Sequence, residues 1–408
     1  MDQAPDHPAD LLPPAHRSAL DVFVTFLRLG LTSFGGPIAH IAYFRQDLIV
    51  RRRWMSEAAY ADIVALCQLL PGPTSSQVGF AIGLNQAGVL GGVGAFVGFT
   101  MPSAIVMFAA AAGLPLLSNE YGTVLLHGFM LVAVSIVAQA VFGMARSFWK
   151  TPATVMIGVS ALAVVLLASL GLIQPVVILA GGVIGLLILP KKDVQPVRHD
   201  LHIRASVITS LSVFVLLLVC LPLLASGSGG GLMSVADAFY RSGAFVFGGG
   251  HVVLPLLEAE TVGRGWLDEE TFLAGYGVAQ ALPGPLFTFA AYLGAISNTG
   301  ATLLVAGPLA LAMIFLPGFL LVTAALPLWL RLRDLPRAVA FVGGANAAVV
   351  GLLAAALWDP VTRSAVLSPA DAVIAALGFL LLQRFRTPPL IVITLIIAAV
   401  VGVDSAVN

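Results

Sequence analysis

The chain has 408 residues, of which 59% are hydrophobic and only 10% are charged. A soluble domain carries about 25% charged residues, so this composition excludes the soluble classes and favours helices in a lipid bilayer. The formal net charge is zero, which leaves no basic surface for nucleic acid. We therefore expect an all-α polytopic integral membrane protein whose partner is the lipid bilayer, with no nucleic acid.

The first apolar segments are too short to cross a membrane. After a polar, proline-rich tail at 1–17, which predicts disorder and not a signal peptide, apolar segments cover 18–33 and 57–70. A spanning helix needs about 20 residues, so these two are predicted to be half-helices or arms of a re-entrant hairpin. Further helices of this half are predicted over 74–95, 96–116, 123–146, 153–170 and 174–190.

The same order of features returns 213 positions later. Phe26 matches Phe239 and, after a slip of one residue, Trp54 matches Trp266. A repeat of this length indicates two homologous halves. The predicted domains are an N-terminal repeat at 18–190, a linker at 191–232 with one helix at about 206–225, a C-terminal repeat at 233–403 and a tail at 404–408. In the second half, helices are predicted over 233–247, 269–282, 286–304, 305–330, 337–358, 369–384 and 388–403.

The loop charges predict that the two halves have opposite orientations. In the first half, residues 45–53, 146–150 and 191–204 carry arginine or lysine, and the turns between them do not. The copy of the first basic loop, residues 258–270, instead has five carboxylates and one arginine. Basic loops stay on the inner side of a membrane, so equivalent loops have exchanged sides. This is an inverted-topology repeat, in which the linker helix reverses the second copy.

Each half contains a Pro-Gly-Pro break at the end of an apolar segment. Pro71-Gly72-Pro73 follows Gln68, and Pro283-Gly284-Pro285 follows Gln280. Proline removes backbone donors, and in a bilayer such a break is tolerated only where it lines protein or a water-filled cavity. The predicted function is an anion site at the breaks, and the alternative is a kinked helix without a ligand.

The residues around the breaks predict where helix ends lie. Ser56 and Asp268 are predicted N-caps of the helices that precede the breaks. Thr74, Ser75 and Ser76 are predicted to cap the half-helix that follows the first break. The free N–H groups of such a helix end would point back at the break, and their dipole favours an anion.

Two further features recur within apolar stretches. Phe34-Gly35-Gly36-Pro37 matches the segment from Phe247 to Gly250, although the second copy has glycine in place of proline; paired glycines either free the backbone or admit a close helix neighbour. Arg28 matches Arg241, and an arginine at the bilayer centre costs roughly 2.5 to 3.5 kcal/mol. An anionic partner or snorkelling to the surface are the two interpretations.

The candidate substrate-binding residues share a place in these repeated motifs or beside them. Neutral donors such as Ser76, Gln77 and Asn85 could share an oxyanion, although each has a structural role as its alternative. The candidate set is Arg28, Ser33, Phe34, Gly35, Gly36, Pro37, Gln68, Pro71, Gly72, Pro73, Thr74, Ser75, Arg241, Phe247, Gly248, Gly249, Gly250, Gln280, Pro283, Gly284, Pro285 and Thr288.

Metal and catalytic chemistry are not expected. Cys67 and Cys220 lie in apolar runs, which predicts neither disulfides nor a thiolate site. His40, His127 and His251 lack the spacing of metal ligands. There is no pair of nucleophile and base and no phosphate-binding loop, so we expect no cofactor, no metal and no enzyme activity.

The paired motifs, with Arg52 and Trp54 between them, resemble the chromate ion transporter family in its long form with two homologous halves. The resemblance covers about residues 20–403. It implies a secondary transporter in the cell inner (plasma) membrane that exports chromate and confers chromate resistance, driven by the membrane potential or by ion exchange. Sulfate is the expected competitor of chromate, and association of two copies into a homodimer is a further expectation. Transport of another anion and a non-transporting membrane scaffold are the alternatives.

Overall fold

The computed structural model describes residues 17–34, 36–117, 120–167, 173–190, 205–228, 231–247, 250–300, 302–329 and 336–407. Regular secondary structure in these ranges is helical, which confirms the all-α class. Within them, five helices are long and apolar enough to cross a bilayer. They cover Thr74–Gly113, Gly122–Phe148, Ala205–Ser226, Leu303–Leu328 and Arg337–Ala365.

The helices of the first half are followed by equivalent helices in the same order in the second. The first half contains α1 (Ala19–Thr32), α2 (Gly36–Phe44), η2 (Arg45–Arg51), α3 (Glu57–Leu69), α4 (Thr74–Gly113), η3 (Leu114–Leu117), α5 (Glu120–Phe148), α6 (Pro152–Leu167) and α7 (Ile173–Ile188). After α8 (Ala205–Ser228) come α9 (Leu232–Ala244), η4 (Gly250–Val252), α10 (Val253–Thr261), α11 (Glu269–Ala281), η5 (Leu286–Thr288), α12 (Phe289–Ile296), α13 (Leu303–Ala325), η6 (Leu326–Leu328), α15 (Pro336–Ala356), η7 (Leu357–Thr362), α16 (Arg363–Ala365), α17 (Pro369–Gln383) and α18 (Pro389–Val407).

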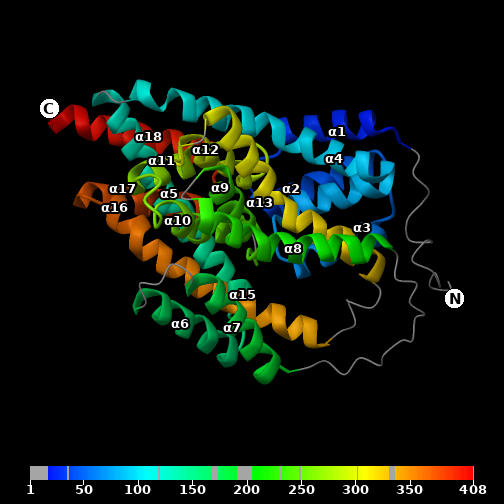
Figure 1. Ribbon diagram of the computed structural model, residues 1–408. Coiled ribbons are helices and arrows are strands. Elements are labelled where there is room, and N and C mark those ends of the chain that lie inside the picture. Colours follow the sequence, from blue (N-terminus) through cyan, green and yellow to red (C-terminus); the bar gives the residue numbers. More distant parts are fainter. Residues whose placement is uncertain are drawn as a thin grey trace.

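The two halves are interleaved. The long helix α15 of the second half packs against α6 and α7 of the first, and Figure 1 shows these three helices together, on the side of the molecule away from α1 and α4. In the same way, α5 of the first half packs against α17 and α18 of the second. The halves therefore bury their surfaces against each other and do not form two separate domains.

Local capping explains where the short helices begin. The Ser56 hydroxyl accepts a hydrogen bond from the Ala59 N–H at 3.2 Å, and the Asp268 carboxylate accepts one from the Thr271 N–H at 2.7 Å. Both predicted caps are confirmed. The helices that they start, α3 and α11, have 13 residues each, which is short of a full crossing.

The chain turns back earlier than the sequence predicted. Within α4, Ala87 and Gly88 leave the helical conformation, and Gly88 has a φ of +63°. A Cβ built on Gly83 would lie 2.3 Å from the Gly91 carbonyl oxygen. Eight residues along one helix would be about 12 Å apart, so the two arms of α4 must fold back on each other. The predicted boundary between 95 and 96 is therefore wrong, because the turn occurs at a glycine that tolerates positive φ.

The second half has the same correction. Its turn lies between α12, which ends at Ile296, and α13, which begins at Leu303, and not at the predicted boundary between 304 and 305. A Cβ on Gly294 would lie 2.5 Å from that of Ala310, so these two arms are also closely packed.

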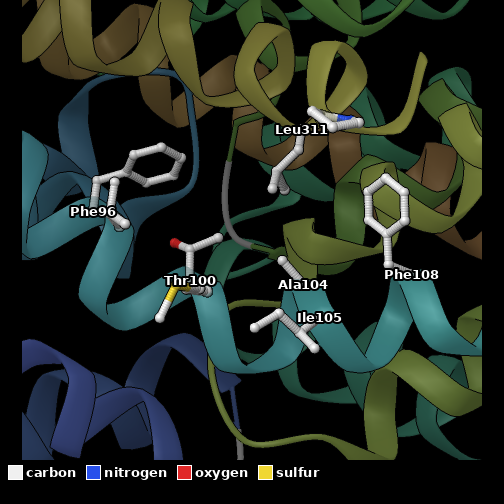
Figure 2. A pocket seen from close by; sticks show the side chains of 9 residues that line it. Phe96, Thr100, Ala104, Ile105, Phe108 and Leu311 are labelled. Carbon is white, nitrogen blue, oxygen red and sulfur yellow. The ribbon is translucent and has the colours of Figure 1, made fainter. Parts of the chain in front are cut away.

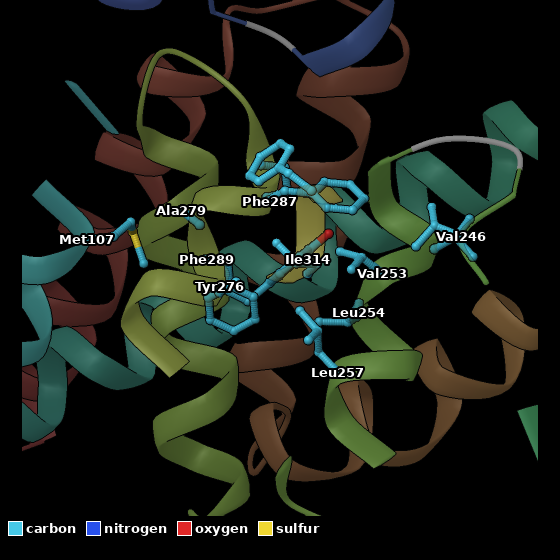
Figure 3. Close-up of a cluster of buried hydrophobic side chains, with 14 of the residues drawn as sticks. Met107, Val246, Val253, Leu254, Leu257, Tyr276, Ala279, Phe287, Phe289 and Ile314 are labelled. Atoms are coloured by element: carbon cyan, nitrogen blue, oxygen red, sulfur yellow. The ribbon is translucent and has the colours of Figure 1, made fainter. Parts of the chain in front are cut away.

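Aromatic side chains fill the core beside the second break. Tyr276, Phe287 and Phe289 are buried together with Ile314 of α13, and Figure 3 shows them facing Val253, Leu254 and Leu257 of α10. This packing fixes α11, α12 and α13 around the Pro-Gly-Pro segment. The outer faces instead expose apolar side chains, as at Leu223 of α8, which is the pattern expected of a surface that faces lipid.

Candidate functional site

The two breaks are joined to the opposite halves by a pair of crossed hydrogen bonds. The Gly72 N–H donates to the Val246 carbonyl at 2.7 Å, and the Gly284 N–H donates to the Ser33 carbonyl at 2.9 Å. Ser33 and Val246 are equivalent positions in the repeat, as are Gly72 and Gly284. Each Pro-Gly-Pro segment is therefore bound to the chain that leaves the first helix of the other half.

The glycine-rich motifs meet at the same place. A Cβ on Gly250 would lie 3.3 Å from the Cγ of Pro37 and 3.8 Å from a side-chain carbon of Leu286, which follows the second break. Phe34 is half-buried, Phe247 is buried, and Gly36 begins α2 with a φ of +80°. Three further candidates, Gly35, Gly248 and Gly249, lie outside the described residues.

Only glycine fits at the centre of each break. Gly72 has a φ of +128° and Gly284 a φ of +99°, a region that residues with a Cβ rarely adopt. A Cβ would also lie 2.8 Å from Nε2 of Gln77 at the first break and 2.9 Å from Oγ of Ser103 at the second. The flanking prolines provide no N–H, so the glycine N–H is the one donor inside each Pro-Gly-Pro segment.

Both helices that follow the breaks begin without a side-chain cap. The N-cap residues are Pro73 for α4 and Pro285 for η5, and neither has a capping hydrogen bond. The prediction that Thr74, Ser75 and Ser76 cap this helix is wrong, because α4 already begins at Thr74 and these residues lie within its first turn. Backbone N–H groups of the first turn have no partner within the helix. These ends therefore keep donors that an anion can use.

Polar side chains gather around the first break. The Gln77 side chain is fully buried, and its Nε2 donates to the carbonyls of Pro71 at 2.9 Å and Gly318 at 3.2 Å. In the described part of the structure, the Oε1 of Gln77 and the hydroxyls of Ser33 and Ser76 are buried without a hydrogen-bond partner. Gln77 and Ser76 lie beside the first break, and Ser33 lies where the chain bonds to the second break. Buried polar atoms are nearly always paired, so these orphaned atoms indicate places for a polar ligand or water.

The second break has different polar neighbours from the first. The Thr288 hydroxyl donates to the Pro285 carbonyl at 2.9 Å, and Pro283 is half-buried. Gln280 bonds to the Tyr276 side chain, whereas Gln68, its equivalent on α3, is exposed. The two breaks therefore have the same backbone geometry but different side-chain surroundings.

The two repeated arginines differ sharply in environment. Arg241 is bound to the carboxylates of Asp237 at 2.8 Å and Glu260 at 2.9 Å. Arg264 contacts the same two carboxylates, at 3.2 Å from Asp237. Burial raises the pKa of Glu260, and the two arginines oppose that rise. The charge of Arg241 is thus balanced within the protein.

Arg28 is exposed on α1, and within the described ranges it forms no ion pair. In the first half, the position equivalent to Asp237 is Val24, which has no carboxylate to pair with Arg28. The structure therefore does not bring Arg28 and Arg241 together, and neither arginine contacts a Pro-Gly-Pro segment in the described part of the chain.

The arms of the two halves are packed to different extents. On α11, Gly277 lies against α5, where an added Cβ would be 2.3 Å from the Phe129 carbonyl oxygen. Its equivalent on α3 is Ala65, which is exposed, and α3 has little contact with α15. One arm is therefore closed onto the opposite half while the other is open.

A cavity of about 310 Å³ lies between α4 and α13. Figure 2 shows Phe96, Ala104, Ile105, Phe108 and Leu311 around it, with Thr100 as its polar residue. Ile105 is 59% exposed, so the cavity opens towards the lipid-facing surface. An apolar lining without a charged group cannot stabilise a desolvated anion, so this cavity is not a candidate for the predicted anion site. Among the residues that the structure describes, no three His, Cys, Asp or Glu side chains converge as metal ligands do.

Comparison with known proteins matches both halves to one family. The family described as "Chromate transporter" matches residues 20–186 and 233–403. A "Chromate transport protein" of Pseudomonas aeruginosa is 29% identical over 98% of this chain and 95% of its own length. Another "Chromate transport protein", of Cupriavidus metallidurans, is 27% identical over 90% of this chain and 89% of its own length. No solved structure has significant similarity to the chain.

Proposed function

Because the chain belongs to the chromate transporter family, we propose that it exports chromate from the cell across the cytoplasmic membrane and so confers chromate resistance. The observation that supports this proposal most directly is the crossed pair of hydrogen bonds, from Gly72 to Val246 and from Gly284 to Ser33. These bonds bring two interrupted helices into one region of the protein. Helix ends with free N–H groups and orphaned hydroxyls in that region suit a small oxyanion.

The proposed mechanism is alternating access between two inverted halves. The equivalent order of helices, with α8 as the additional one, is what such a repeat requires. The difference between the arms supports the same mechanism, since α11 packs extensively against α5 whereas α3 has little contact with α15. In the opposite state, α3 would close onto α15 and α11 would open.

The membrane potential is sufficient to drive export. A dianion that leaves a cell with a negative interior gains about 4.6 kcal/mol at a potential of ~100 mV. That free energy sustains a concentration ratio of roughly a thousandfold. Export therefore needs no coupling ion, whereas import of the same dianion against this potential would.

The test is efflux of chromate from vesicles loaded with it, with an imposed potential that is negative inside. The full chain should release chromate in a potential-dependent manner, and Gly72→Leu and Gly284→Leu should not. Gly143→Leu is the matched control, since a Cβ there meets nothing within 4 Å.

If the wild type shows no potential-dependent efflux, the protein is a scaffold without transport. Efflux from both break variants at the wild-type rate would remove the site from the breaks. Excess sulfate inside the vesicles should slow chromate release if the site recognises tetrahedral dianions.

A further inference from the structure

His40 is the side chain that joins the two breaks. It lies on α2 and is only 1% exposed. Its Nδ1 is 3.2 Å from the hydroxyl of Ser75 in the first turn of α4. The ring also faces the backbone carbonyl of Ser33, which accepts the hydrogen bond from Gly284. One imidazole therefore contacts the helix end at the first break and the chain that holds the second.

No carboxylate or cation contacts this ring in the described part of the structure. On α4, the group that faces His40 besides Ser75 is the ring of Phe99, which packs edge-on at 5.2 Å. The α4 sequence contains no charged residue at all. Arg28 and Asp21 of α1 are exposed, away from the buried imidazole.

The charged residues described on η2, and the tyrosine of α3 beside α2, direct their polar groups elsewhere. On η2, Arg45 pairs with Glu57 of α3 at 2.7 Å, and Asp47 pairs with Arg52 at 2.8 Å. Tyr60 of α3 donates its hydroxyl to the Ile41 carbonyl at 2.6 Å. Among the side chains that the structure describes, His40 is thus a buried titratable group in contact with the proposed anion site, and no described charge beside it fixes its protonation.

We propose that His40 takes up a proton when an oxyanion binds at the breaks. This inference rests on the proposed function and specifies its coupling. A neutral imidazole is stable beside a hydroxyl and a carbonyl, whereas a dianion at the adjacent helix ends stabilises the imidazolium by direct Coulomb attraction. The imidazolium in turn supplies the positive charge that the helix ends alone lack. If this proton is carried with the anion, the transported charge falls from two to one, and the gain from the membrane potential is halved.

Linkage gives the proposal a measurable sign. If anion binding raises proton affinity at His40, then a proton raises anion affinity by the same factor. There is a pH range in which His40 is neutral in the free protein and protonated in the complex. Within that range, anion affinity falls as the pH rises, by up to about tenfold per pH unit, which is the limit for one linked proton.

The test uses the purified full chain in detergent and sulfate as the probe, because sulfate stays a dianion in the range studied whereas chromate takes up a proton. Titration calorimetry in two buffers of different ionisation enthalpy measures protons taken up per sulfate bound. The wild type should take up close to one proton, and its affinity should fall as the pH rises. His40→Gln keeps a hydrogen-bonding side chain beside Ser75 without a titratable group, and its affinity should be independent of pH.

His127→Gln is the matched control, since His127 pairs with Asp371 at 3.0 Å between α5 and α17. It should keep the proton uptake and the pH dependence of the wild type.

Sulfate binding by the wild type without proton uptake would overturn the inference and leave the proposed function standing. An unchanged pH dependence in His40→Gln would do the same. Failure of the wild type to bind either sulfate or chromate would instead overturn the proposed function. If the protein binds chromate but not sulfate, the calorimetry is done with chromate, and the protons that chromate itself exchanges are subtracted from the measured uptake. If His40→Gln does not fold, proton uptake by the wild type decides.

Discussion

The backbone N–H of Gly284 donates a hydrogen bond to the Ser33 carbonyl at 2.9 Å, which ties the break of the second half to the first helix of the first. The equivalent residues, Gly72 and Val246, form the reciprocal bond. Each bond needs a Pro-Gly-Pro segment that leaves one free N–H and a free carbonyl just after the end of a helix. Both requirements are met twice because the sequence is repeated, and the predictions below test what this junction does.

Gly72→Ala should destabilise the protein, because it places a Cβ where φ is +128° and where Nε2 of Gln77 would be 2.8 Å away. We expect a loss of about 1 to 3 kcal/mol, the usual cost of a strained backbone conformation. Thermal unfolding in detergent measures it. Gly143→Ala, at a position with open space around it, should unfold like the wild type. Equal unfolding temperatures for Gly72→Ala and the wild type would contradict the conformation described for this break.

Gln77→Met should weaken the first break while it preserves side-chain volume. The change removes the donors to Pro71 and Gly318 and leaves two buried carbonyls with fewer partners, at a cost of about 1 to 3 kcal/mol. Because the Oε1 has no protein partner, we also expect weaker binding of the anion. Unfolding and vesicle efflux are measured on the same preparation. Wild-type efflux together with reduced stability would assign Gln77 a purely structural role.

Arg241→Gln and Arg28→Gln form a matched pair at equivalent positions. Loss of Arg241 leaves Asp237 and Glu260 buried with only Arg264 to compensate them, and breaking a buried pair costs about 3 to 5 kcal/mol. Arg28 is exposed, so its removal should leave the unfolding temperature unchanged. If Arg28→Gln nevertheless loses chromate efflux, Arg28 acts on the substrate. Equal destabilisation by the two changes would contradict the charge pairing.

Glu258 should make stability depend on pH. Burial raises the pKa of this carboxyl, outside the apolar spans, to about 7, and Glu269 and Asp359 add to the rise. The folded protein then holds a proton that the unfolded chain releases near pH 4.5, so stability falls as the pH rises from about 4.5 to about 7. Glu258→Gln should reduce the difference in unfolding temperature between pH 5 and pH 8. Glu270→Gln, at an exposed position of the same region, should not. The same difference in wild type and Glu258→Gln would contradict the assignment.

Gly277→Leu should separate α11 from α5. No side chain fits between Gly277 and the Phe129 carbonyl, so the substituted helix must move outward. Ala65→Leu, at the equivalent but exposed position of α3, should be neutral in the conformation described. The measurement is labelling of single cysteines introduced near Gly284 by a reagent that does not cross membranes. Increased labelling in Gly277→Leu alone is expected, and unchanged labelling would argue against movement of this arm.

Much of the local structure could be predicted because it depends on neighbours in the sequence. The caps at Ser56 and Asp268 are formed within three residues of the chain, and the ends of α3 and α11 follow from the prolines after them. The positions of the hairpin turns were not predicted correctly. Polar residues do interrupt the apolar sequence there, with Asn85 and Gln86 before Gly88 and Ser297 to Thr299 before Gly300. Which of the many glycines reverses the chain depends on packing between separate positions, as where Gly83 and Gly91 lie closely against each other.

The sequence by itself determined the class of the protein, its two halves and the motifs that the halves share, because composition, hydropathy and repetition are properties of the chain. Only the tertiary structure decided which motifs meet. It showed that Gly284 bonds to Ser33 and that Gly72 bonds to Val246. It also distinguished two arginines that look equivalent in the repeat, since carboxylates neutralise Arg241 and no carboxylate among the described residues pairs with Arg28. The physical reason is that charge pairing and backbone bonding between distant segments depend on how helices pack, and packing is decided by the whole chain.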